Sequence, residues 1–333
     1  MLAAGFWFYN TLDETRILRR EYARLRATGE NTPANLYAFY NAYIPRVGTT
    51  TVMAVLAENP LCHGDSHEFG KFVLSQSLNF HEAILSCGNL CDNGCTHGVL
   101  MDAFKKTGEE GHVDVAEIEA QIGAICDTYS RVGPLVDCVH AIGHGLKAAT
   151  HGFGDAIGVC EKFGDPHLRY YCITGVFMQN DIDKGERTAQ GVALHAPCDS
   201  AAPMNQGACY VYKTFRMLIG LNDYGATLNE CASLAGFARM GCFHGLGRAY
   251  TGLIAYEPAY LHTVCRHAPG DEEMLACIDG GVEAIAEVFP EVAKKACASL
   301  PSNLRSFCLD IKGKSTMLTK QTLKLYYPSE KNR

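Results

Sequence analysis

Apolar residues recur at helical spacing through most of this chain. In residues 116–129, AEIEAQIGAICDTY, the side chains of Ile118, Ile122 and Ile125 are three or four positions apart, which places them on one face of a helix. No segment shows a sustained alternation of apolar and polar residues with the period of two that is typical of a β-sheet. The pattern therefore predicts an all-α protein.

Paired cysteines divide the helical pattern into units. The two members of each pair are 11 or 12 residues apart, and the second members recur every 31 to 37 residues, a period of about 34. Turn residues such as Gly133 and Pro134 lie between the two members, so each pair brackets a turn between helices. The six pairs are Cys126/Cys138, Cys160/Cys172, Cys198/Cys209, Cys231/Cys242, Cys265/Cys277 and Cys297/Cys308. This period indicates helical hairpins that stack into a curved solenoid or a closed α/α toroid.

The even cysteine count predicts that disulfides staple these corners. Sixteen cysteines in 333 residues are more than cytosolic proteins usually carry. We therefore predict an extracytoplasmic location, either periplasmic, secreted or membrane-anchored and facing outside. The alternative is a cytosolic protein with reduced thiols in its core, because free cysteine behaves as a small apolar residue. Cys62, Cys87, Cys91 and Cys95 fall outside the series, and their three possible connectivities stay open.

Three regions of the chain differ in pattern. Residues 1–60 are predicted to form an N-terminal helical segment, residues 61–312 carry the cysteine and histidine repeats, and residues 313–333 form a C-terminal cap and tail. Residues 1–10 contain the apolar run LAAGFWFY, which indicates either a trimmed membrane anchor or signal, or a buried start. No other apolar run is long enough to cross a membrane.

Three helices are expected within the N-terminal segment. Residues 13–29 read as an amphipathic helix that ends at Gly29, and residues 35–45 and 49–60 read as short helices that are each closed by a proline.

The overall charge excludes one class of partner. The formal net charge is −7, and no run of basic residues is longer than Arg19-Arg20. No basic surface is therefore expected to bind nucleic acid. The sequence contains no phosphate-binding glycine loop, no nucleophile elbow and no HExxH motif, which excludes the simplest nucleotide-binding, lipase and zinc-protease interpretations.

Histidines recur at equivalent positions of the units. His140 and His244 each lie two residues after the second cysteine of a pair, and His97 likewise lies two residues after Cys95. His144 lies one helical turn after His140. His63 and His67 form another pair four residues apart. Residues with this spacing share one face of a helix, and an HxxxH pair can hold one metal ion through two imidazoles.

We therefore predict a histidine-lined metal site. Its ligands are His63, His67, His97, His140, His144 and His244, gathered around one central cavity that admits a small molecule or peptide. Imidazole suits zinc, copper and iron alike, so the sequence indicates only a divalent transition metal. Glu68 and Glu283 are the predicted catalytic carboxylates of a metal-assisted hydrolysis or oxidation, and Asp65 is a further candidate.

A second interpretation involves no catalysis. Histidines near helix starts also cap adjoining turns, and a stack of helical hairpins can bind a peptide or protein on its concave face. The sequence leaves both functions open, together with the oligomeric state. The remaining histidines lack an HxxxH partner and are interpreted as structural or surface residues: His81, His112, His151, His167, His195, His262 and His267.

Overall fold

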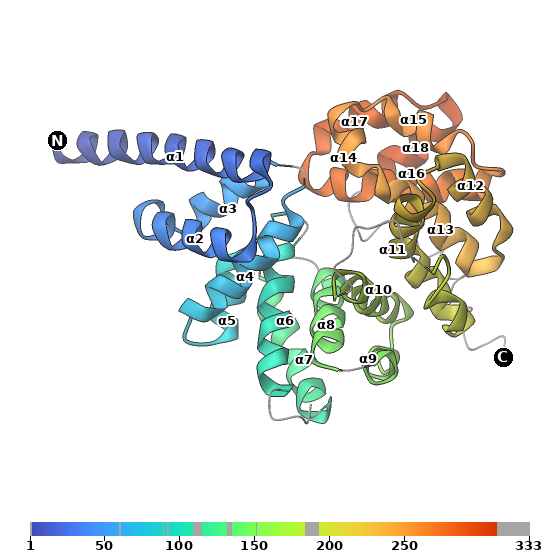
Figure 1. The fold of residues 1–333 in the computed structure, drawn as a ribbon, viewed down its shortest axis with the longest axis horizontal. Coiled ribbons are helices and arrows are strands. Elements are labelled where there is room, and N and C mark those ends of the chain that lie inside the picture. The colour runs from blue at the N-terminus through green and yellow to red at the C-terminus, as the bar shows by residue number, and fades with distance from the viewer. Residues whose placement is uncertain are drawn as a thin grey trace. The chain divides into compact units, whose positions relative to one another are not determined.

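The chain is helical wherever its structure is described. The computed structural model describes residues 2–59, 61–88, 90–91, 93–108, 115–131, 135–150, 152–183 and 193–311. Every regular element within these ranges is a helix, which confirms the all-α prediction (Figure 1). None of the described helices combines the length and the hydropathy needed to span a bilayer. The predicted cap and tail at 313–333 lies outside the described residues.

Two compact units make up the chain, Met1–Ala141 and Ile142–Arg333, with their boundary inside α8. The helices of the first unit are α1 (Leu2–Thr28), α2 (Pro33–Val47), α3 (Thr49–Ala57), α4 (His63–Gln76), α5 (Phe80–Cys87), α6 (Gly94–Gly108), α7 (Val115–Tyr129) and the start of α8 (Leu135–Ala149).

Local signals explain where the first helices begin and end. α1 stops at Gly29, whose φ of 69° is a conformation that glycine adopts readily, as predicted. Thr32 caps α2, because its side-chain oxygen accepts a hydrogen bond from the Asn35 N–H. The prediction that Pro45 closes this helix is wrong. α2 continues past Pro45 and ends at Val47, with Gly48 as its C-cap, so the proline lies in the last turn of the helix.

Glycines let α4 and α6 pack at very short range. A Cβ built on Gly70 would overlap the carbonyl oxygen of Cys95, and a Cβ built on Gly98 would overlap the carbonyl oxygen of His67. Only glycine permits two helix backbones to approach this closely. These two reciprocal contacts fix the register between α4 and α6.

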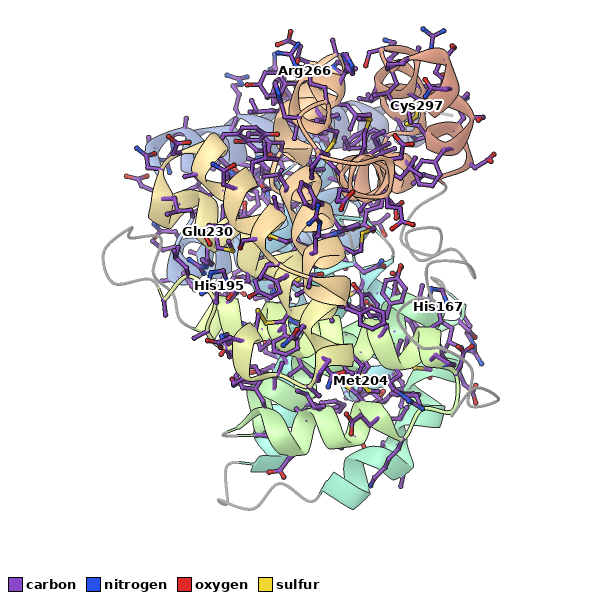
Figure 2. All side chains as sticks on the ribbon, turned by 90° about the vertical axis from the view of Figure 1, so that its right-hand side faces the viewer. His167, His195, Met204, Glu230, Arg266 and Cys297 are labelled. Carbon is purple, nitrogen blue, oxygen red and sulfur yellow. A yellow bond between two sulfur atoms is a disulfide. The ribbon has the colours of Figure 1, made fainter. Side chains whose placement is uncertain are left out.

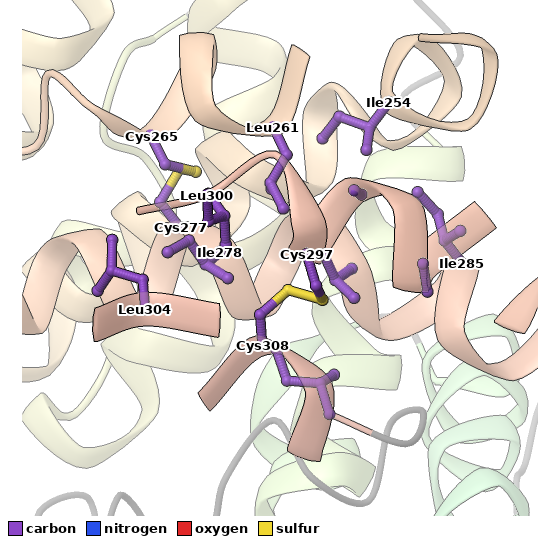
Figure 3. Close-up of a cluster of buried hydrophobic side chains, with 14 of the residues drawn as sticks. Ile254, Leu261, Cys265, Cys277, Ile278, Ile285, Cys297, Leu300, Leu304 and Cys308 are labelled. Atoms are coloured by element: carbon purple, nitrogen blue, oxygen red, sulfur yellow. A yellow bond between two sulfur atoms is a disulfide. The ribbon is translucent and has the colours of Figure 1, made fainter. Parts of the chain in front are cut away.

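The second unit continues the same kind of packing around its own core. Its helices are the rest of α8, α9 (Phe153–Glu161), α10 (Pro166–Asp183), the 3-10 turn η1 (Cys198–Ser200), α11 (Pro203–Leu221), α12 (Tyr224–Ser233), α13 (Gly236–Ala249), α14 (Thr251–Tyr256), α15 (Tyr260–Cys265), α16 (Asp271–Val288), α17 (Pro290–Ala298) and α18 (Ser302–Asp310). Figure 3 shows two disulfides among the buried side chains of Ile254, Leu261 and Ile278. The bridges therefore form part of the apolar core.

Every cysteine is paired. All six predicted pairs form disulfides, with Cα–Cα distances of 5.4–5.6 Å, and each lies within one unit. The connectivity that the sequence left open is Cys62–Cys91 and Cys87–Cys95. Eight disulfides are typical of a protein from an oxidising, extracytoplasmic environment.

Candidate metal centre

Three of the predicted ligands lie together in the first unit. His63 is the first residue of α4, His67 follows one turn later, and His97 lies in the first turn of α6. Their ring centroids are 4.5 to 5.4 Å apart. One nitrogen from each ring can be chosen so that all three nitrogens lie within 4.8 Å of one another. The three histidines could therefore hold one metal ion. We call these three residues the histidine triad.

A disulfide and a glycine position the triad. The bond between Cys62 and Cys91 ties the residue before α4 to the loop that leads into α6. Gly98, directly after His97, lies against the carbonyl group of His67. The disulfide therefore aligns the starts of the two helices, and the glycine brings them close enough for their imidazoles to meet.

Hydrogen bonding sets the direction of the His63 ring. Its Nδ1 lies 3.0 Å from the carbonyl oxygen of Cys91. A carbonyl oxygen only accepts, so Nδ1 of His63 carries the proton and Nε2 carries the lone pair. A backbone carbonyl that fixes the outer nitrogen in this way is typical of metal-binding histidines.

The Nε2 atoms of His63 and His67 are about as far apart as two nitrogen ligands of one metal ion. Nε2 of His67 lies 3.0 Å from Nε2 of His63, so His67 donates its Nε2–H to the lone pair of His63. A tetrahedral ion with metal–nitrogen bonds of 2.0–2.1 Å separates its ligand nitrogens by about 3.3–3.4 Å. A metal ion could therefore replace the shared proton with little movement of the two rings.

Two of the three imidazoles of the triad are buried. The exposed fractions of His67 and His97 are 4% and 0%, whereas His63 is only partly buried and gives access from one side. The ring of His140, on α8, lies 5.0 Å from that of His97 and is also buried. The first unit thus carries a row of four imidazoles, of which His63 is the least buried.

The two other predicted ligands belong to the second unit. His144 lies one turn after His140 on α8, and its Nδ1 is 3.0 Å from the side-chain oxygen of Gln179. His244 lies on α13, with its Nε2 3.5 Å from an oxygen of Glu283. Their membership of one six-histidine site stays a prediction.

Both predicted catalytic carboxylates form ion pairs with neighbouring cations. Glu68 accepts from Lys71 Nζ at 2.6 Å within α4, and Glu283 pairs with Arg248 in the second unit. The catalytic role of Glu68 and Glu283 stays a prediction.

Asp65 anchors α1 to α4. Its carboxylate accepts from the Tyr22 hydroxyl at 2.6 Å, from Arg26 at 2.9 Å and from the side chain of Asn31 at 2.8 Å, while its backbone oxygen accepts from Tyr40. Burial and the nearby carboxylate raise the pKa of Tyr22 far above its usual value, so this hydroxyl stays a donor. These contacts give Asp65 a structural role.

Replacing Asp65 by Asn is expected to lower the free energy of unfolding by about 2–3 kcal/mol, because a largely buried ion pair loses its charge. Urea denaturation measures the effect. The control is Asp13→Asn, which removes an exposed ion pair with Arg16 on α1 and is expected to cost less than about 1 kcal/mol. Equal effects of the two substitutions would contradict the anchoring role.

Asn93 is a positioning residue that sequence analysis missed. It is fully buried with a φ of 57°, and its backbone oxygen accepts from the His97 N–H at the start of α6. Its side chain donates to Asp137 at 2.6 Å and accepts from Tyr129. Asparagine tolerates left-handed backbone better than most residues, which was the only local signal for this role.

Two histidines outside the predicted site, His81 and His195, form side-chain hydrogen bonds, and that of His81 is with the Thr128 hydroxyl at 2.7 Å. His195 lies between the Tyr210 hydroxyl, at 2.9 Å, and the Glu230 carboxylate, at 3.2 Å. Figure 2 labels His195 and Glu230. Burial, with Asp199 and Glu230 nearby, raises the pKa of Tyr210 to about 12. Burial lowers the pKa of His167. His112 and His151 lie outside the described residues.

Comparisons with models of known protein families, with curated proteins and with solved structures found no match for this chain.

Proposed function

We propose that this chain is an extracytoplasmic, disulfide-stapled protein that binds a divalent transition metal ion through the histidine triad. The observation that carries the proposal is the arrangement of His63 and His67. The two Nε2 atoms are 3.0 Å apart, and the outer nitrogen of His63 is held by the Cys91 carbonyl. A metal ion would take the place of the proton that these two nitrogens share, and His97 lies close enough to supply a third nitrogen.

The donor set favours zinc, copper or iron. Three imidazoles and no carboxylate suit these borderline metals, whereas magnesium and calcium prefer oxygen ligands. His140, beside His97, is the next available donor if the ion recruits a fourth imidazole.

The proposal also includes catalysis by the bound metal ion. Three protein ligands leave a coordination position at which a metal ion supplies Lewis acidity or redox chemistry to a small molecule or peptide. In a hydrolysis, Glu68 would act as the general base after its ion pair with Lys71 opens. The competing proposal is a non-catalytic protein that binds a peptide, and the ion pairs of Glu68 and Glu283 favour it.

Repeated packing is the basis for proposing a solenoid or a closed toroid. The glycine contacts that join α4 to α6 recur between α13 and α16, where Gly247 meets the carbonyl of Cys277 and Gly280 meets that of His244. When successive helices pack through the same contact in the same register, they form a regular stacked array. We propose that the second helices of successive hairpins form the inner layer of such an array.

Metal titration of the oxidised chain without an affinity tag tests the proposal. We expect one tightly bound Zn²⁺ at the triad, and His67→Ala is expected to weaken this binding by at least about 100-fold, because loss even of an outer hydrogen-bond partner costs 10- to 100-fold. Isothermal titration calorimetry measures the affinity. Binding should also weaken as the pH falls, because protons compete with the metal ion for the imidazole lone pairs.

An exposed histidine provides the matched control. His267→Ala removes a surface imidazole from the second unit and is expected to leave Zn²⁺ affinity unchanged. Equal affinities of the His67→Ala and wild-type chains would overturn the proposal and would favour the peptide-binding alternative.

A further inference from the structure

The two halves of α1 have different surroundings. In the second half, Leu18, Tyr22 and Leu25 are buried and lie three or four residues apart, so one face of the helix packs on α2 and α3. Arg19 also pairs with Glu58, directly after α3, at 2.7 Å. Figure 1 shows the first turns of the same helix extending beyond α2 and α3. The packed half of α1 therefore fixes the direction in which the other half projects.

The projecting turns carry a sequence that is apolar on every side of the helix. Residues 2–9, LAAGFWFY, are all apolar or aromatic, and eight successive residues of a helix point in all directions around its axis. A helix that packs on a protein surface needs only one apolar face, whereas a helix that is apolar all round is normally buried in a core or in lipid. None of the other described helices of the first unit lies alongside these turns in Figure 1. The core of the first unit therefore does not cover them.

The residue types in this segment are those of a membrane–water interface. Tryptophan and tyrosine are enriched where the headgroups of a bilayer meet its acyl chains, and phenylalanine and leucine side chains insert between those chains. Residues 2–9 extend about 12 Å along the helix, far less than the hydrocarbon core of about 30 Å. The segment therefore fits the outer part of a bilayer without crossing it.

Arginines follow the apolar turns along α1. Arg16, Arg19 and Arg20 are exposed, and residues 13–28 contain five arginines but only three acidic residues, in a chain whose net charge is −7. Basic residues beside an apolar segment attract the anionic headgroups of phospholipids. The charge of this helix is therefore complementary to an anionic lipid surface.

We propose that α1 attaches this protein to phospholipid membranes, with residues 2–9 inserted among the lipids and the exposed arginines at the headgroups. This attachment is separate from the histidine triad, which lies on α4 and α6. It does not depend on the bound metal ion.

Trp7 is a probe for the experiment, because it is the only tryptophan in the chain. Vesicles of phosphatidylcholine, alone or mixed with phosphatidylglycerol, are added to the full-length, oxidised chain, and tryptophan fluorescence is recorded. We expect the emission to shift to shorter wavelength, because the indole ring leaves water for a less polar environment. Co-sedimentation measures the bound fraction, which should be larger for the anionic vesicles.

Replacing one aromatic residue tests the inserted segment. Phe8→Ser is expected to weaken vesicle binding by about tenfold or more, since burial of a phenylalanine side chain contributes at least this factor. Leu78→Ser is the matched control, because Leu78 is 92% exposed in the connection between α4 and α5, and vesicle binding should stay unchanged. An unchanged urea midpoint confirms that each variant is folded.

Replacing one arginine tests the attraction to headgroups. Arg20→Gln is expected to weaken binding to the anionic vesicles by about fivefold and to leave binding to the neutral vesicles unchanged.

Three results would overturn the membrane attachment. The first is a Trp7 emission that neither kind of vesicle changes, and the second is equal vesicle binding by the Phe8→Ser and wild-type chains. The third is an emission shift that depends on protein concentration alone, which would indicate association between copies of the chain instead. None of these results bears on Zn²⁺ binding by the triad.

Discussion

Reduction of the disulfides is expected to unfold the chain at room temperature. The bridges close loops of 8 to 29 residues, and each is expected to contribute about 2–4 kcal/mol. Eight such contributions exceed the 5–15 kcal/mol by which proteins are normally stable. Reduction would also expose thiols that lie in the apolar cores.

Circular dichroism with and without a phosphine reductant measures this effect. The oxidised chain should show a cooperative urea transition, and the reduced chain should lack one. Thiol titration in denaturant before reduction is the control, and we expect it to find no free thiol. Recovery of most thiols without reductant, or an unchanged urea midpoint after reduction, would contradict the stapled fold.

Adding one methyl group to α4 is expected to have the next largest effect. Gly70→Ala places a Cβ on the Cys95 carbonyl oxygen, which is backbone and cannot rotate away. We expect the free energy of unfolding to fall by about 3 kcal/mol, the upper part of the range for overpacking. Because α4 and α6 carry the triad, Zn²⁺ affinity should fall as well.

Gly64→Ala is the matched control in the same helix. A Cβ at Gly64 would meet no atom within 4 Å. Alanine is the better helix former, so we expect a neutral effect or a gain of up to about 1 kcal/mol. Urea denaturation compares the two variants, and equal stability would show that α4 and α6 are not held at the distance described.

The sequence by itself determined the features that depend on short separations. Cysteines 11 or 12 residues apart, with turn residues between them, gave six disulfides that all form, because a helical corner keeps such residues within reach. His63 and His67 share one face because a helix repeats every 3.6 residues. The error at Pro45 was small, because proline usually ends a helix close to its own position and α2 ends at Val47.

Only the tertiary structure decided how distant segments meet. It paired Cys62 with Cys91, bound Glu283 to Arg248 and brought His97 to the two histidines of α4. Such contacts depend on the distance and register between helices. Many packing interactions together set that distance and register, and no regular spacing in the sequence reveals them. Here the distance between α4 and α6 depends on glycines whose partners are carbonyl groups on another helix, and no spacing along the chain identifies those partners.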